Sequence, residues 1–276
     1  METKEPLTII LEHGLGNQLF ILFTGISKAI DENRDFIVYP IYNTFRKFFF
    51  TSLLKSLLFK VAPIVNLHSK EDLYEEPHFH YSPIPNNKKA IKGYFQSPKY
   101  FHHNKNKIIE ILNLNPFIYK YKFDYKTIGI HLRFGDMSFN QGNHIILKPS
   151  YFINAIHKLK QEISNINDYK FIIFGEKDDN EIIDDYIQII NDEFANLDLY
   201  KFYDVYPNMR DYQELMFMSN CEHLIIANST FSWFGAYLND YPEKKVIYPN
   251  KWFGILNSSK NDMKDLFMDN WIKVNE

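Results

Sequence analysis

The sequence is poor in cysteine and lacks a long apolar segment near its start. Cys221 is the only cysteine among 276 residues, so no disulfide can form within one chain, which fits a reducing compartment. The partly apolar stretch 7–30 is interrupted by polar residues such as His13 and Lys28, and it has the character of neither a signal peptide nor a membrane span. We therefore expect a cytoplasmic protein without a transmembrane segment.

A strong charge of either sign is also missing. With 31 basic and 34 acidic residues the formal net charge is -3, which gives no overall attraction to nucleic acid or to an anionic membrane. Any phosphate-binding site must therefore be local, and nucleic acid is not an expected partner. The absence of a GxxxxGK loop argues against a P-loop ATPase.

What the sequence does contain is an alternation of strand and helix patterns. Apolar runs at 127–132 and 169–174 flank the segment 149–163, whose apolar residues have helical spacing. The first half begins in the same way, with a predicted strand at 7–11 and a helix after it. This alternation predicts an α/β fold with parallel sheets that helices cover on both faces.

The two α/β halves predict two domains. The best boundary lies within 115–126, so we expect an acceptor-side domain over 1–120 and a nucleotide-binding domain over 121–276. Ligands of parallel sheets bind beyond the carboxyl ends of the strands. Polar residues that directly follow a predicted strand are therefore the candidates for a site.

The first such group follows the strand at 7–11 and reads HGLGNQ over residues 13–18. Its glycines permit a tight turn, and the helix that follows offers free N–H groups to an anion. The pattern partly matches the GxGxxG dinucleotide fingerprint, but Leu19 occupies the place of the third glycine. A plain turn into a helix explains the motif equally well, and a Rossmann dehydrogenase would need the complete fingerprint.

The second group is HLRFGD over residues 131–136. Alternation along the strand places His131 and Arg133 on the same side, and the Arg133 guanidinium is a rigid fork of donors suited to phosphate. Gly135 lets the chain turn, and Asp136 can orient the fork or the imidazole. A purely structural Arg–Asp pair at a strand end is the alternative interpretation.

The third group, NSTFSW over residues 228–233, lies between a predicted strand and a predicted helix. Ser229 or Thr230 is a good N-cap, and hydroxyls beside free N–H groups can cradle a diphosphate. An ordinary capped helix is the alternative. Histidine pairs at 78/80 and 102/103 lack a nearby carboxylate or cysteine set, so we expect no metal site.

Four segments taken together resemble glycosyltransferase family 11, the α1,2-fucosyltransferases. In order they are 13–20 (HGLGNQLF), 93–101 (GYFQSPKYF), 131–136 (HLRFGD) and 227–238 (ANSTFSWFGAYL). The resemblance implies a GT-B-like fold of two facing Rossmann-like domains. It also implies GDP-fucose as the donor co-substrate, inversion at the anomeric carbon, a glycan acceptor, and no cofactor or metal requirement.

The resemblance also assigns roles to residues. Arg133 would grip the β-phosphate of the donor with His131 beside it. The other donor-binding residues would be Gly16, Asn17, Gln18, Asn228, Ser229, Thr230 and Ser232. A base must take the proton of the attacking hydroxyl late in the reaction. His13 and Asp136 are its candidates, beside the catalytic Arg133.

Two departures from the family pattern leave the activity open. Phe134 replaces the second arginine of HxRRGD, and Phe234 replaces a tryptophan. We expect Phe134→Arg to be tolerated and to tighten donor binding. We predict transfer of fucose to a glycan hydroxyl, most simply the 2-hydroxyl of a terminal galactose. The alternatives are a weak or inactive glycan- or nucleotide-binding module of the same fold, or a glycosyltransferase for another nucleotide sugar.

Overall fold

The computed structural model describes residues 4–40, 72–135 and 142–276. The chain divides into two compact units, unit 1 (residues 1–115 and 261–268) and unit 2 (residues 116–260 and 269–276). The division predicted at residues 120 and 121 does not include the return of 261–268 to unit 1. In that segment Asp265 pairs with Lys99 and accepts a hydrogen bond from the backbone N–H of Tyr81 at 3.2 Å.

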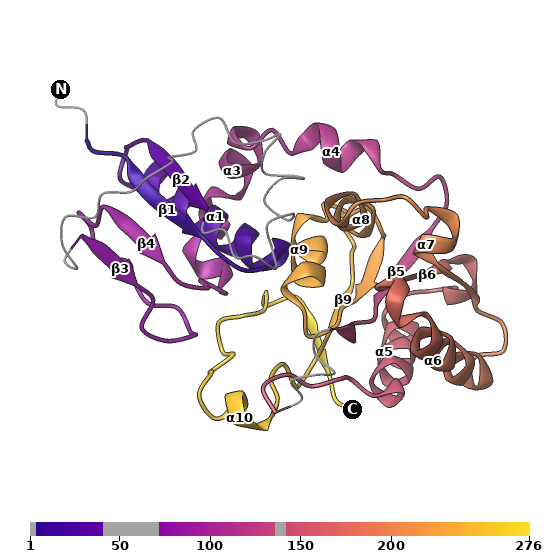
Figure 1. Cartoon of the computed structure of the whole chain (residues 1–276). Coiled ribbons are helices and arrows are strands. Elements are labelled where there is room, and N and C mark those ends of the chain that lie inside the picture. The colour runs from indigo at the N-terminus through magenta and orange to yellow at the C-terminus, as the bar shows by residue number, and fades with distance from the viewer. Residues whose placement is uncertain (1–3, 41–71, 136–141) are drawn as a thin grey trace. The chain divides into compact units, whose positions relative to one another are not determined.

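Unit 1 contains a four-stranded sheet in which every pair is parallel, in the order β2-β1-β4-β3 (Figure 1). Its strands are β1 (Leu7–Leu11), β2 (Phe36–Pro40), β3 (Leu73–Glu75) and β4 (Ala90–Lys92). The helical segments are α1 (Leu15–Asp31), η2 (Pro98–Tyr100), η3 (His102–Asn104) and α3 (Lys105–Ile111). All five residues of β1 are buried, so the strand after which HGLGNQ begins is the centre of this unit.

Helix α1 packs tightly against β1. The contact requires a glycine at position 25, because a Cβ atom there would lie 2.4 Å from the Ile9 side chain. The close approach fixes the first turn of α1, which carries Gly16, Asn17 and Gln18, next to the end of β1.

Unit 2 contains a six-stranded sheet, again parallel at every pair, in the order β10-β9-β8-β5-β6-β7. Its strands are β5 (Thr127–His131), β6 (Lys170–Phe174), β7 (Asp198–Lys201), β8 (His223–Ile225), β9 (Val246–Pro249) and β10 (Ile272–Val274). The longer helices are α5 (Pro149–Glu162), α6 (Asn180–Glu193), α8 (Asp211–Met218) and α9 (Thr230–Leu238). Short helical segments are α4 (Asn115–Lys120, which begins at the boundary between the units), η5 (Ile166–Asp168), η6 (Lys177–Asp179), α7 (Phe202–Val205) and α10 (Ile255–Ser258).

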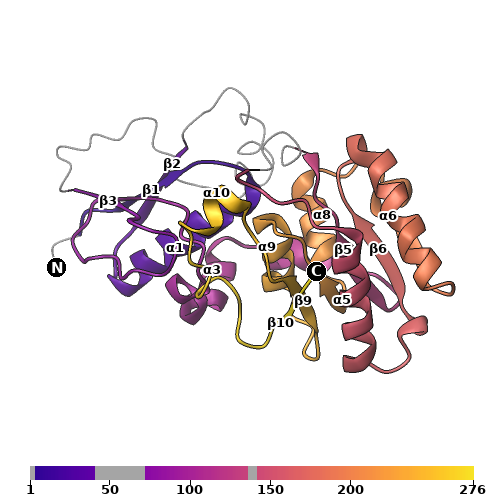
Figure 2. The same ribbon diagram turned by 90° about the horizontal axis from the view of Figure 1, so that it is seen from below.

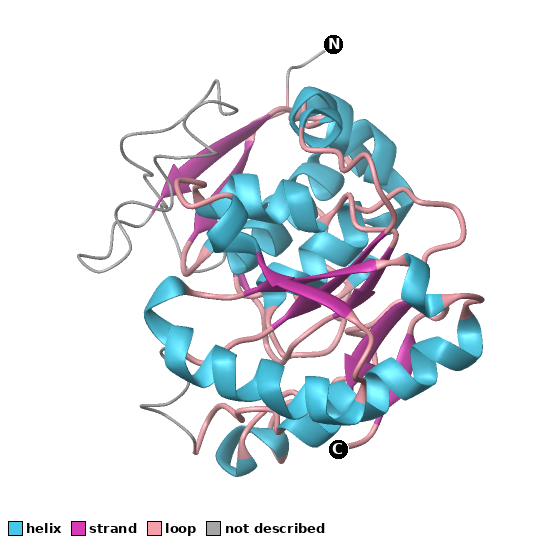
Figure 3. Ribbon diagram, turned by 90° about the vertical axis from the view of Figure 1, so that its right-hand side faces the viewer, coloured by secondary structure: helices cyan, strands magenta, loops and turns pink. Residues whose placement is uncertain are grey.

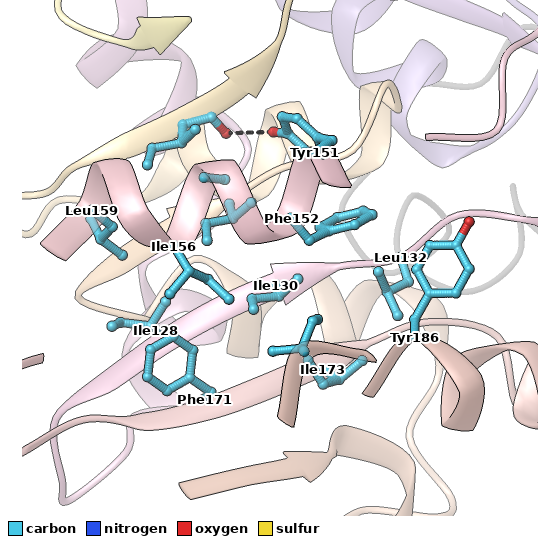
Figure 4. Packing of buried hydrophobic residues seen from close by; sticks show 14 of the residues in the cluster. Ile128, Ile130, Leu132, Tyr151, Phe152, Ile156, Leu159, Phe171, Ile173 and Tyr186 are labelled. Atoms are coloured by element: carbon cyan, nitrogen blue, oxygen red, sulfur yellow. Dashed lines mark hydrogen bonds between the residues drawn. The ribbon is translucent and has the colours of Figure 1, made fainter. Parts of the chain in front are cut away.

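A buried cluster of unit 2 lies between this sheet and the helices α5 and α6 (Figure 4), which Figure 2 shows beside β5 and β6. Phe152 and Ile156 of α5 pack over Ile130 of β5 and Ile173 of β6. The hydroxyl of Tyr151 donates a hydrogen bond to the carbonyl of Ile226 at 2.8 Å, which ties α5 to the segment after β8. The cluster therefore holds the carboxyl ends of β5 and β8 in fixed register.

Helices and parallel strands alternate through both units (Figure 3). The predicted strands at 127–132 and 169–174 correspond to β5 and β6, and the predicted helix at 149–163 corresponds to α5. The α/β prediction, with a GT-B-like pair of units that each contain a parallel sheet, is confirmed. In the described residues no helix is both long enough and apolar enough to cross a bilayer.

Candidate functional site

His131 is the last residue of β5 and is 5% exposed. Its ring lies against Phe231 of α9, with 5.7 Å between the ring centroids. Burial, and secondly the charge of Arg133, lowers the pKa of His131 to about 3, so the imidazole is neutral near pH 7. Within the described chain Nδ1 has no hydrogen-bond partner. Buried polar atoms are nearly always satisfied, so this nitrogen marks a position where a ligand would complete the structure.

Arg133 lies two residues further along the chain and pairs with Glu176, which follows β6. Gly135 takes a positive φ of 33°, and its N–H donates a hydrogen bond to Asp179 Oδ2 at 3.0 Å. A Cβ atom at Gly135 would lie 3.2 Å from both carboxylate oxygens of Glu176. Because Gly135 has no side chain, the Glu176 carboxylate has room beside the turn that carries Arg133.

A third acidic residue near Arg133 was missed by the sequence analysis. Burial, and secondly the charges of Asp211 and Glu176, raise the pKa of Glu214 to about 8, although the charge of Arg133 opposes this shift. Glu214 lies on α8 rather than after a strand, so a search of strand ends could not find it. Its one signal in the sequence is a lone carboxylate directly before the apolar run at 215–218.

The predicted diphosphate cradle is the turn into α9. Ser229 is the N-cap, and its Oγ accepts a hydrogen bond from the Phe231 N–H at 3.3 Å. Thr230 is the first helical residue and is half-buried. The turn therefore presents a hydroxyl-bearing helix start at the end of β8.

Two other predicted donor ligands of this turn are engaged inside the protein. Asn228 is 4% exposed, and its Nδ2 donates hydrogen bonds to the carbonyls of Ile145 at 2.9 Å and Trp252 at 3.1 Å. Ser232 is fully buried, and its hydroxyl lies 3.2 Å from the carbonyl of Ser229. Both side chains fix the shape of the turn. In the described structure the Asn228 Oδ1 atom accepts no hydrogen bond.

Phe134 does not lie at a position from which an arginine side chain would face a ligand. It is 3% exposed and belongs to the core under α6, where its ring meets that of Tyr186 edge to face at 4.9 Å. An arginine here would bury its charge among apolar side chains. The expectation that Phe134→Arg is tolerated is therefore corrected.

In unit 1 the polar residues after β1 form a second cluster. His13 adopts a left-handed backbone with φ of 71°, whereas Gly14 has φ of -80°, so the strained residue of this turn is the histidine. The His13 ring stacks on that of Tyr94 with 4.5 Å between centroids. The backbone carbonyl of His13 accepts a hydrogen bond from Gln18 Nε2 at 2.7 Å. The Asn17 Oδ1 atom accepts one from Gln96 Nε2 at 2.8 Å.

Gly16 and Asp136 are the remaining predicted residues. Gly16 is buried in the first turn of α1, and Asp136 lies outside the described residues. The described parts of the chain bring together no group of three or more histidine, cysteine or acidic side chains with metal-binding geometry.

Comparison with known proteins gives one family and several relatives. The model of glycosyl transferase family 11 matches residues 8–275. The O-antigen biosynthesis glycosyltransferase WbnK of Escherichia coli is 32% identical over 174 residues, which is 60% of this chain and only 51% of that protein. An alpha-1,2-colitosyltransferase of Escherichia coli is 27% identical over 281 residues, covering 88% of this chain and 91% of that protein.

Solved structures give more distant matches. The fucosyltransferase NodZ from Bradyrhizobium matches with a TM-score of 0.48 and 12% identity, covering 86% of this chain and 94% of that one.

Proposed function

The chain belongs to glycosyl transferase family 11, and on that premise we propose that it transfers fucose from GDP-fucose to a glycan hydroxyl with inversion at the anomeric carbon. The acceptor position is the 2-hydroxyl of a terminal galactose. One observation carries the proposal beyond membership of the family. A neutral, buried histidine, one nitrogen of which has no partner among the described residues, lies two residues from a guanidinium at the end of β5.

Arg133 is proposed to bind the β-phosphate. As the bond between the anomeric carbon and the phosphate oxygen stretches, negative charge builds on the leaving GDP. A planar guanidinium can meet two phosphate oxygens at once, which neutralises this charge. In the structure the Glu176 carboxylate pairs with Arg133. The diphosphate must therefore displace that carboxylate when the donor binds.

His131 is proposed to contact the donor through Nδ1. Because its pKa is lowered to about 3, the ring stays neutral and offers one donor and one acceptor nitrogen. A neutral ring adds hydrogen bonds without adding charge. Selection of the nucleotide can therefore depend on the pattern of donors and acceptors that faces it.

Ser229 and Thr230 are proposed to support the diphosphate at the start of α9, where a helix N-terminus favours anions. Asn228 and Ser232 act by holding the turn in shape, as their hydrogen bonds to the carbonyls of Ile145, Trp252 and Ser229 indicate. Asn17, Gln18 and Gly16 are proposed to contact the donor.

The reaction itself needs one proton transfer. The acceptor oxygen attacks the anomeric carbon in line, the carbon–oxygen bond to the β-phosphate breaks, and GDP leaves. The hydroxyl proton passes to a base, for which His13 and Asp136 remain the candidates. The Glu12 carboxylate lies 3.8 Å from His13 Nε2, so it can stabilise the imidazolium that this transfer would create. No metal ion is part of the proposed mechanism.

A second donor is favoured by the relative named alpha-1,2-colitosyltransferase, which covers 88% of this chain. Colitose is fucose without the 3-hydroxyl, so a site that holds one sugar can hold the other unless it requires that hydroxyl. Transfer of colitose is therefore the second candidate function.

The test supplies GDP-fucose and GDP-colitose separately with glycans that end in β-galactose, in the presence of EDTA. Mass spectrometry of the products identifies the sugar that is transferred, and nuclear magnetic resonance identifies the linkage. The proposal predicts a fucosylated product with an α1,2 linkage in the chelator. Binding of GDP without transfer from either donor would instead assign the chain to the inactive binding modules of the fold.

A further inference from the structure

Two buried glutamines of unit 1 each have an amide oxygen without a partner in the described residues. Gln18 is 5% exposed and Gln96 is 6% exposed, and Oε1 of each accepts no hydrogen bond. Their nitrogens are engaged, because Gln18 donates to the His13 carbonyl and Gln96 donates to Asn17. Leaving a buried acceptor unsatisfied costs about 1–3 kcal/mol, so two in one cluster indicate a missing ligand with hydroxyl donors.

The segment that carries Gln96 is strained and firmly held. Phe95 has a φ of 52°, which is a costly backbone conformation for a bulky residue. One carboxylate oxygen of Glu76 accepts hydrogen bonds from the N–H groups of both Tyr94 and Phe95, each at 2.8 Å. Gly93 must lack a side chain, because a Cβ atom there would lie 2.4 Å from that of Glu76. The fold thus fixes the positions of Tyr94 and Gln96 at the cost of local strain.

An exposed aromatic ring lies in the same short segment as Gln96 and is stacked on His13. The Tyr94 ring is stacked on His13 with an interplanar angle of 10°, and Tyr94 is 44% exposed. His13 is connected to Gln18 through its carbonyl, and Tyr94 is two residues from Gln96. An exposed ring next to uncharged acceptors is the combination that an amphipathic ligand with an apolar face and several hydroxyls requires.

We infer that Tyr94, Gln96, Gln18 and His13 form a subsite for a pyranose sugar, with the ring face on Tyr94 and adjacent hydroxyls donating to the two amide oxygens. The inference rests on the proposed function and deepens it, since Tyr94 and Gln96 are absent from the predicted site residues. Carbonyl oxygens repel phosphate, so the subsite holds a sugar and not the diphosphate. The sugar is either the one transferred or the one that accepts.

The test uses Gln96→Met, which removes the amide at similar length, and Tyr94→Ala with Tyr94→Phe as the conservative partner. Initial rates are measured with varied acceptor and with varied GDP-fucose, and GDP affinity is measured by calorimetry. We expect Gln96→Met and Tyr94→Ala to raise one KM by about tenfold, the value of roughly one hydrogen bond. Tyr94→Phe and GDP affinity should stay near wild type.

The two sources of the sugar separate in this assay. A higher KM for the acceptor alone assigns the subsite to the acceptor, and a higher KM for GDP-fucose with unchanged GDP affinity assigns it to the transferred sugar. Tyr119→Ala changes an aromatic residue of unit 2 that is 56% exposed and serves as the matched control. The inference is overturned if Tyr94→Ala, folded by circular dichroism, keeps both KM values within twofold of wild type.

Failure of the proposed function would be recognised separately. If the wild-type protein transfers no sugar, saturation-transfer nuclear magnetic resonance with free fucose and methyl β-galactoside still reports on the subsite. Contact of either sugar with wild type that Gln96→Met and Tyr94→Ala both abolish supports the inference. No contact of either sugar with wild type rejects it.

Discussion

The clusters at the strand ends of the two units differ in chemistry. In unit 1 the segments after β1 and β4 carry amides and stacked rings, and Gln18 and Gln96 present oxygens that have no partner among the described residues. In unit 2 the end of β5 carries a guanidinium and a neutral imidazole, and the segment after β6 carries the carboxylate of Glu176. Charge suits a diphosphate, whereas uncharged acceptors and a ring face suit a sugar. Under the proposed function, the diphosphate and a sugar would therefore be bound by two different sets of side chains.

Two histidines of unit 2 show how a structural residue differs from a candidate ligand. His223 is 3% exposed and His131 is 5% exposed. The ring of His223 is satisfied, since Nδ1 accepts from the Lys245 N–H at 3.1 Å and Nε2 lies 3.3 Å from the Tyr169 hydroxyl. The Nδ1 atom of His131 has no partner in the described structure. Burial alone therefore does not identify a site, and the unsatisfied nitrogen is what distinguishes His131 from His223.

The largest effect should come from Arg133. We predict that Arg133→Ala loses at least about 100-fold in transfer rate, because removing one donor that stabilises transition-state charge costs about 10²–10³ in turnover. Arg133→Lys should lose at least about 100-fold, and less than Arg133→Ala, since an ammonium cannot form the paired contact. The rate is measured at saturating acceptor, with Arg210→Ala, an exposed arginine of the same unit, as the control. A folded Arg133→Ala protein with near wild-type transfer would make the guanidinium structural.

The next effect concerns stability. Phe134→Arg should lower the free energy of unfolding by about 3 kcal/mol or more, because it places an unpaired charge in the core beneath α6. Phe134→Leu keeps an apolar side chain and should cost about 1 kcal/mol. Urea denaturation of the two variants gives the comparison. Equal stability of the arginine and leucine variants would show that position 134 reaches solvent.

The free energy of unfolding should depend on pH in two ranges, one set by the buried histidines and one by Glu214. His131 and His223 have pKa values of about 3 and about 4 in the folded protein, below the ordinary 6.5. The unfolded chain therefore binds protons first as the pH falls below 6.5. Each histidine then contributes a loss of up to about 1.4 kcal/mol per pH unit.

Glu214 acts in the opposite sense. Its pKa of about 8 lies above the ordinary 4.5, so the folded protein keeps the proton and loses stability as the pH rises from 4.5 to 8. Glu214→Gln should make the free energy of unfolding less dependent on pH between 6.5 and 8, where the histidines contribute little. Denaturation curves at several pH values measure the free energy of unfolding in both ranges. Parallel profiles for wild type and Glu214→Gln over that interval would contradict the assignment.

The smallest effect is expected at Glu176. Its carboxylate is 52% exposed and pairs with Arg133, so it would compete with the proposed phosphate, and an exposed ion pair contributes about 0.2–1 kcal/mol. Glu176→Gln should therefore tighten GDP binding by up to about fivefold at low salt. Calorimetry checks this, with Glu193→Gln, the exposed partner of His157, as the control. Weaker binding would show instead that Glu176 positions the guanidinium.

The sequence was informative where local periodicity decides the structure. Alternating apolar runs located β5, α5 and β6, and the turns after β1, β5 and β8 carried the candidate residues. The same alternation continues beyond β5, where Leu132 and Phe134 are buried at 1% and 3% exposure while the Arg133 side chain is 26% exposed. The pleat therefore predicts the inward direction of Phe134. The family pattern has an arginine at this position, which suggested an exposed side chain instead.

Other features depend on contacts that no local pattern encodes. Glu214 matters because α8 brings it near Arg133, and Gln96 because its only described partner, Asn17, is 79 positions away in sequence. The return of 261–268 to unit 1 depends on Asp265 meeting Lys99. Each needs a tertiary structure before the residue can be recognised.

The central claim is that the charged cluster of unit 2 binds the nucleotide diphosphate and the amide cluster of unit 1 does not. Calorimetric titration of GDP into wild type, Arg133→Ala and Tyr94→Ala tests it directly. The account predicts that Arg133→Ala weakens GDP binding by at least about tenfold, the value of a hydrogen bond to a charged group, and that Tyr94→Ala leaves it unchanged. Equal GDP affinity of wild type and folded Arg133→Ala would contradict the claim.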